Sequence, residues 1–248
     1  MAAPAFRELA LANARELVRD WKTFFFAAVF PFFFLVMFFG MTAVVPNDPG
    51  GPDLARMSLP LVLFTALASV AFFGTAVPLV ALREKGILRL LGTSPVPRRT
   101  LLLAQAPARL LLAAAQITVI IAVTAITGYL DVSRIPALVV SCLLGLAMFG
   151  AFGYLVGGRL PSAEATSQAL AMLLVVLMFA SGLILPLDLL PAGAQTALQA
   201  LPTTYLADAL GHQLVGTPAA FPVWLSYAVL AAGAAVFAGV AARTFRWE

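Results

Sequence analysis

The sequence is poor in charged residues, cysteine and histidine. Charged residues make up 10% of the chain and the mean hydropathy is +1.00, whereas an ordinary soluble domain carries about 25% charged residues. The single cysteine, Cys142, allows no intrachain disulfide. The single histidine, His212, allows no histidine-rich metal site, and we assign it a structural role. These shortages exclude an ordinary soluble domain and predict no metal site.

Several motifs that mark enzymes are also missing. The sequence contains no G-x-S-x-G nucleophile elbow and no H-E-x-x-H. Neither Lys22 nor Lys85 follows the glycine spacing of a Walker A sequence. The eleven acidic residues lie in loops, tails or the edges of apolar segments, which disfavours an ion-coupled transporter. We expect no catalytic residues and no cofactor bound by this chain, so energy for any transport must come from another protein.

What the sequence has instead is long apolar segments. Six of them reach the length needed to cross a hydrocarbon core of about 30 Å. Helices are expected, because a helix satisfies its own backbone polar groups in lipid. The sequence therefore predicts an all-α, polytopic membrane protein that forms one domain over 1–248. The predicted spans cover approximately 23–45, 58–82, 100–128, 135–158, 165–186 and 221–242.

The basic residues are distributed unevenly along this pattern. Twelve of the fifteen Lys and Arg lie at the N-terminus, in 83–99, near Arg159 and at the C-terminus, whereas the opposite loops hold only Arg56 and Arg134. By the positive-inside rule both termini are cytoplasmic. The net charge of +4 thus reflects topology, and no nucleic-acid partner is expected. The excess of Arg over Lys, together with abundant Ala, suggests a bacterial protein and hence the inner membrane.

The densest basic island, 83–99, reads REKGILRLLGTSPVPRR. It lies between an uncharged stretch, 58–82, and a stretch, 100–129, whose only charge is Arg109. Its apolar positions fit one side of a short helix. Such an island either fixes the topology or is the place where a cytoplasmic partner binds the membrane domain.

The first forty residues carry two further patterns. Residues 5–22 have the spacing of an amphipathic helix, which either anchors the chain at the interface or forms an elbow that docks a partner. The first span then holds nine phenylalanines in 24–39. These side chains either face lipid and pack, or form an apolar wall that contacts substrate. Phe33 is our candidate for the second role.

Arg109 lies about ten residues into the third predicted span. If that span begins deep in the interface, the side chain snorkels to the headgroups. If it faces the bundle, it is a functional candidate, because charge within a membrane is costly unless it is paired. Pro31, Pro78 and Pro107 can each kink a span, since each removes a backbone hydrogen bond.

The segment 182–210 lies between the fifth and sixth spans. Pro186, Pro191 and Pro202 divide it into short, half-apolar pieces, and no Lys or Arg occurs over 164–222. We predict a pair of outer re-entrant half-helices, serving either as a lid over an exit path or as packing. Pro186 and Pro202 are candidate gating residues.

These blocks together resemble the membrane subunit of a type-2 ABC exporter, a family that includes drug, polysaccharide and lipid exporters. The residues that carry the resemblance are REKGILRLLGTSPVPRRTLLLAQ at 83–105 and GLILPLDLLPAGAQTALQALPTTYLADAL at 182–210. The second block ends in a Pro–x–x–Tyr element formed by Pro202 and Tyr205, which adds Tyr205 to the candidate gating residues. Gly211 and His212 stand where the family often has an Arg.

The resemblance implies a coupling helix that seats in a separate nucleotide-binding subunit. The residues assigned to this contact are Arg83, Glu84, Lys85, Gly86, Leu88, Arg89 and Leu91. It further implies two permease copies, identical or different, with two ATPase copies that bind ATP and Mg. The expected function is export of a hydrophobic or amphipathic substrate such as a drug, lipid or glycan. The alternative is a membrane scaffold or assembly factor that transports nothing and docks a cytoplasmic partner.

Overall fold

The structure, a computed structural model, describes residues 2–44, 53–87, 104–185 and 187–244. Every regular element in these ranges is helical. In chain order they are α1 (Ala2–Arg19), α2 (Trp21–Phe24), η1 (Phe25–Val29), α3 (Phe30–Val44), α4 (Leu54–Ala71), η2 (Phe72–Ala76), α5 (Val77–Glu84), α8 (Ala106–Ile126), η3 (Val132–Arg134), α9 (Ile135–Gly157), α10 (Ala163–Ala180), η4 (Leu187–Leu189), α11 (Ala192–Gln199), α12 (Pro202–Val215) and α13 (Val223–Thr244).

Six helical stretches are long and apolar enough to cross a membrane, which confirms the predicted fold class. They are Trp21–Thr42, Leu54–Glu84, Ala106–Ile126, Val132–Gly157, Ala163–Ala180 and Val223–Thr244. Two of them contain a π-helical turn, η1 in the first span and η2 in the second. The third stretch starts six residues later than predicted, which brings Arg109 close to the start of its helix.

The second span is the centre of the bundle. Its most apolar window is 100% buried within the protein, against 17–33% for the other five spans. It packs against α3, α8, α9 and α12, while α13 packs along α9. The five outer spans keep apolar faces exposed, as expected where lipid rather than water surrounds the protein.

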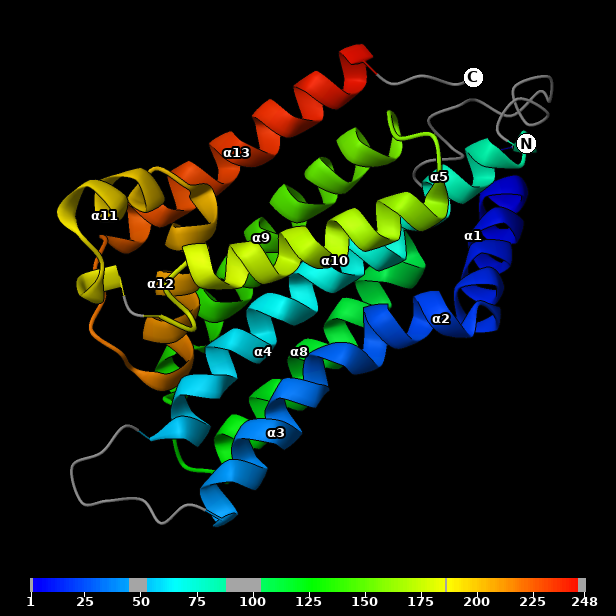
Figure 1. Ribbon diagram of the computed structural model, residues 1–248. Coiled ribbons are helices and arrows are strands. Elements are labelled where there is room, and N and C mark those ends of the chain that lie inside the picture. Colours follow the sequence, from blue (N-terminus) through cyan, green and yellow to red (C-terminus); the bar gives the residue numbers. More distant parts are fainter. Residues whose placement is uncertain (1, 45–52, 88–103, 186, 245–248) are drawn as a thin grey trace.

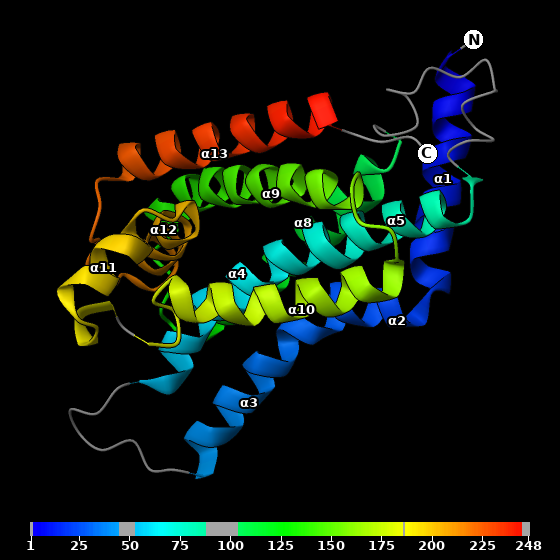
Figure 2. The ribbon, with the colours of Figure 1, turned by 45° about the horizontal axis from the view of Figure 1, so that its top comes forward.

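The bundle has two distinct ends (Figures 1 and 2). One end, here called the α5 end, carries α1, the end of α5, the turn between α9 and α10 and the last turns of α13. The other, the α12 end, carries α11, α12 and the start of α4. α1 runs across the direction of the spans, and the chain turns at Asp20, whose side chain caps α2 by accepting from the Thr23 amide.

Candidate functional site

Arg109 on α8 is a buried cation that joins three spans. Its side chain is 9% exposed. Nε donates to the Gly74 carbonyl in η2 at 2.7 Å, and Nη1 donates to the Tyr154 hydroxyl on α9 at 3.0 Å. Nη2 donates to Oε1 of Gln105 at 2.7 Å. Arg109 therefore faces the other helices rather than snorkelling outward, and it links α8 to the second and fourth spans.

The Gly74 carbonyl lacks its usual α-helical donor because of a proline. In a regular α-helix it would accept from the amide four residues later, which is the position of Pro78, and proline has no N–H. The chain widens into the π-helical turn η2 at this point. A carbonyl left without a partner is costly inside a membrane protein. Arg109 thus replaces a hydrogen bond that the sequence of the second span removes.

A second polar residue on the same helix donates to backbone carbonyls of the first span. Gln116, two turns after Arg109 and 3% exposed, donates from Nε2 to the Ala27 carbonyl at 2.9 Å and to the Ala28 carbonyl at 3.1 Å. Ala27 lies four residues before Pro31, so its carbonyl has lost its helical donor. Ser69 Oγ also donates to it, at 3.1 Å. One face of α8 therefore stabilises the widened turns of both preceding spans.

At the end of α5, the first residues of the predicted coupling segment hold the neighbouring turn. Arg83 Nη2 donates to the Leu160 carbonyl, and Oε2 of Glu84 accepts from the Ala163 amide at 3.1 Å. Glu84 thereby caps the N-terminus of α10, where a negative charge is favourable. These two contacts join the α5 end to the turn before α10.

The rest of the coupling segment is only partly described. Lys85 follows α5 and is exposed, and Gly86 has φ +69°, a left-handed conformation that a side chain would strain. The structure does not describe Leu88, Arg89 and Leu91, so these predicted contact residues lie outside the described residues. The assignment of this segment to a partner contact stays a prediction.

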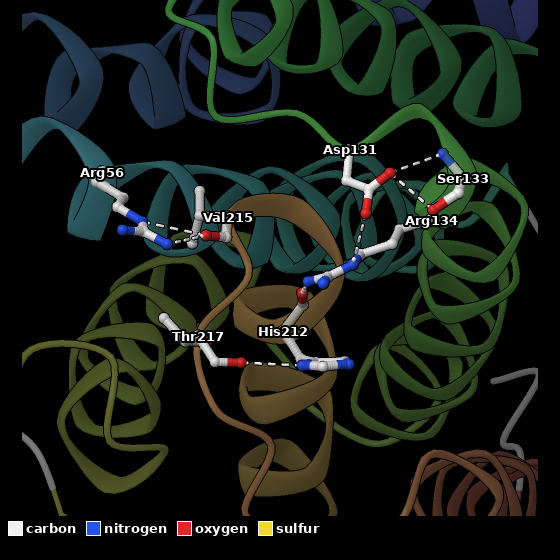
Figure 3. Close-up of polar contacts among 7 residues, drawn as sticks. All are labelled: Arg56, Asp131, Ser133, Arg134, His212, Val215 and Thr217. Carbon is white, nitrogen blue, oxygen red and sulfur yellow. Dashed lines mark hydrogen bonds and ion pairs between the residues drawn. The ribbon is translucent and has the colours of Figure 1, made fainter.

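At the α12 end, two arginines hold the C-terminus of α12 (Figure 3). Nε and Nη2 of Arg56 both donate to the Val215 carbonyl, at 3.0 and 2.6 Å, and Nη1 of Arg134 donates to the His212 carbonyl at 2.8 Å. The last carbonyls of a helix have no partner within it and favour positive charge. Arg56 and Arg134, the two basic residues in the loops opposite the basic clusters, therefore cap the C-terminus of α12.

A small network extends from this cap (Figure 3). Asp131 forms an ion pair with Arg134 Nε at 3.2 Å and accepts from the hydroxyl and amide of Ser133. Those two hydrogen bonds lower the pKa of the Asp131 carboxyl below its usual range. His212 Nδ1 donates to the Thr217 carbonyl at 2.9 Å and closes the turn after α12.

A cavity of about 730 Å³ lies beside this network, between the start of α4, the end of α10 and α12. Its acidic residues already have partners. Asp208 accepts from the amides of Ala220 and Phe221, and Asp53 accepts from the Tyr129 hydroxyl and the Arg56 amide. The charged residues of the lining, Asp53, Arg56 and Asp208, are thus all engaged in hydrogen bonds within the protein.

The predicted gating residues do not form one cluster. Pro202 is in the first turn of α12, and the Tyr205 ring packs on Phe221 with centroids 4.4 Å apart, both at the α12 end. Phe33 is 58% exposed on α3. Arg109 lies near the start of α8, and Pro186 falls outside the described residues. Their roles in gating stay predictions.

Gln116, and the capping roles of Arg56 and Arg134, were not predicted. The sequence does contain a signal for Gln116. Pro31 and Pro78 mark two carbonyls that lose their donors, and Arg109 and Gln116 are seven residues apart, hence on one helical face. A search for donors that match proline-freed carbonyls would have found both. Nothing comparable marks the cap of α12, since it depends on contacts between distant segments.

The fold and these sites define a class: a six-span helical membrane protein whose buried polar groups stabilise widened helical turns. Comparison with known families identifies it more closely. Residues 51–243 match the family described as "ABC-2 family transporter protein". This match covers most of the chain, so the chain belongs to that family and is an ABC-type permease. A search of curated proteins found no match.

Proposed function

We propose that this chain is the membrane subunit of an ATP-driven exporter in a bacterial inner membrane, with both termini and the α5 end in the cytoplasm. A separate ATPase subunit binds ATP and Mg, and two copies of each subunit form the working unit. Family membership and the concentration of basic residues at the α5 end support this proposal. The substrate we propose is hydrophobic or amphipathic, in keeping with the phenylalanine-rich first span.

The observation that carries the mechanism is the contact of Arg83 and Glu84 with the turn before α10. A push on the segment after α5 would move the central second span and α10 together. The π-helical turns η1 and η2 give the first and second spans places to bend. ATP binding by the partner would in this way shift the bundle between two arrangements.

The contact with the ATPase is tested by placing charge on its predicted apolar face. The double variant Leu88→Asp/Leu91→Asp should reduce co-purification with an ATPase from the same genome at least tenfold. Its matched control is Val132→Asp/Leu189→Asp, which changes two apolar residues that are 73% and 71% exposed away from the α5 end. Normal retention of the ATPase by the first variant would show that the segment is not the contact.

Transport itself requires a second measurement. The complex in proteoliposomes should move a hydrophobic dye or lipid only when ATP is present. ATPase activity that responds only to hydrophilic solutes would contradict the proposed substrate class. A complex that assembles normally but transports none of a broad panel of substrates would favour the scaffold alternative.

A further inference from the structure

A cavity of about 560 Å³ lies at the α5 end, between α1, α2, the end of α5 and the start of α8. Its volume is in the range of small-ligand sites. The described residues that line it are Ala12, Asn13, Arg15, Arg19, Asp20, Thr23, Gly74, Pro78, Ala81, Lys85, Gln105, Ala108 and Arg109. Residues 12–23, which form one wall of this cavity, lie outside the residues 51–243 that match the family.

The lining carries strong positive charge. Arg15 and Arg19 from α1 and Lys85 after α5 are exposed at the cavity, and Arg109 is buried within its lining. The one acidic residue among the described lining is Asp20. Its two oxygens accept from the Thr23 amide and hydroxyl, at 3.4 and 2.6 Å, so this carboxylate is already occupied in capping α2.

Arg109 has no ionic partner in the described part of the chain: no Asp or Glu oxygen lies within 4.0 Å of it. Its three hydrogen bonds go to neutral oxygens and use three of the five N–H groups of a guanidinium. The stretch 88–103, which connects α5 to α8, contains three arginines and no acidic residue, so it supplies no counter-charge either. A buried cation without a counter-charge among the described residues is stabilised by an anion that binds beside it.

The position of the cavity selects the kind of anion. It is lined both by α1, which precedes the first span, and by Arg109 within the third span. It therefore straddles the membrane boundary, at the depth of lipid headgroups. Trp21, which follows the lining residue Asp20 in the sequence and is 69% exposed, is a residue type enriched at that depth. A phosphate there would accept paired hydrogen bonds from arginines.

We propose that this cavity binds the phosphate of an anionic phospholipid. Arg15, Arg19 and Lys85 attract the headgroup at the mouth, and the free N–H groups of Arg109 face the phosphate below. The acyl chains extend along the apolar surfaces of the neighbouring spans. Bound lipid would tie α1 to α5 and α8, the elements next to the proposed ATPase contact.

The test uses the full chain, delipidated and placed in nanodiscs that contain phosphatidylcholine with a fraction of phosphatidylglycerol. Mass spectrometry of retained lipid should show preference for phosphatidylglycerol. In Arg15→Gln/Arg19→Gln the preference should fall about twenty-five-fold, because each basic side chain near a membrane surface contributes about fivefold. The matched control, Arg7→Gln/Arg159→Gln, removes two exposed arginines that do not line the cavity and should retain the preference.

Soluble probes separate the two sources of phosphate. Thermal melting in detergent should rise with phosphatidylglycerol and change little with the same concentration of inorganic phosphate or glycerol 3-phosphate. A rise with the soluble anions alone would overturn the lipid assignment. Equal lipid preference in wild type and Arg15→Gln/Arg19→Gln, with both proteins monodisperse and melting alike without lipid, would overturn the site itself.

Discussion

Arg109 and Pro78 should be coupled energetically, because the arginine donates to the carbonyl from which the proline withholds a donor. The perturbation is a double-mutant cycle of Arg109→Met and Pro78→Ala. Arg109→Met removes the side-chain donor that lies 2.7 Å from the Gly74 carbonyl. Pro78→Ala restores a backbone N–H at the position from which an α-helix would supply one.

The magnitude follows from the groups that lose partners. A buried carbonyl left unpaired costs about 1–3 kcal/mol, and the Gln105 oxygen adds a smaller amount because it borders the α5-end cavity. Arg109→Met also removes the desolvation cost of the buried guanidinium charge, which offsets part of this loss of stability. We expect Arg109→Met to lower the free energy of unfolding by about 2 kcal/mol. In the Pro78→Ala background the loss should fall to about 1 kcal/mol, because the new amide pairs with the carbonyl.

The assay is thermal unfolding of the four proteins in one detergent. A loss of about 2 kcal/mol corresponds to roughly 4–8 °C for a chain of this size. Leu111→Met, on the same helix and 73% exposed, is the control and should melt like wild type. Additive effects of the two substitutions would refute the argument that Arg109 replaces the missing proline donor.

Two further predictions concern packing and pH. Gly153→Ala should destabilise the protein by about 1–3 kcal/mol, since its Cβ would lie 2.7 Å from the Ala71 carbonyl oxygen. The control is Gly150→Ala on the same helix, whose Cβ meets nothing within 4 Å and which should leave the melting temperature unchanged or slightly raised. Equal melting of the two variants would contradict this packing. The lowered pKa of Asp131 means that its contribution to stability is present above the ordinary aspartate pKa and lost as pH falls through the lowered folded value. The melting temperature of Asp131→Asn should therefore fall less steeply than that of wild type as the pH drops below about 4. An equally steep fall in both proteins would show that the carboxylate contributes nothing.

The fold class was predictable because the constraint that produces it acts within each segment. An apolar stretch in lipid must satisfy its own backbone, so length and hydropathy alone indicate a helix. The boundaries were less accurate. The helix of the third span, α8, begins at Ala106 with Pro107 in its first turn, a position that proline favours, whereas the predicted span began at 100.

The site was predicted unevenly. Arg109 stands out in the sequence as the only charge in 100–129, but the choice between an outward and an inward side chain depended on where α8 begins and what surrounds it. Arg56 and Arg134 entered the prediction only as exceptions to a charge count. Their hydrogen bonds to α12 join residues that are 159 and 78 positions apart in the sequence, and no local sequence pattern predicts such contacts.

By itself the sequence determined that this chain is a helical membrane protein, how many spans it has and which loops are basic, since these follow from hydropathy and charge in contiguous stretches. It also determined which carbonyls would lack donors, because each proline removes one four residues earlier. Only the tertiary structure decided which side chains supply the replacements, that Glu84 caps α10, and that four basic residues converge on one cavity. The reason is that buried polar groups must be satisfied by whatever packs against them, and packing partners are chosen by the whole bundle.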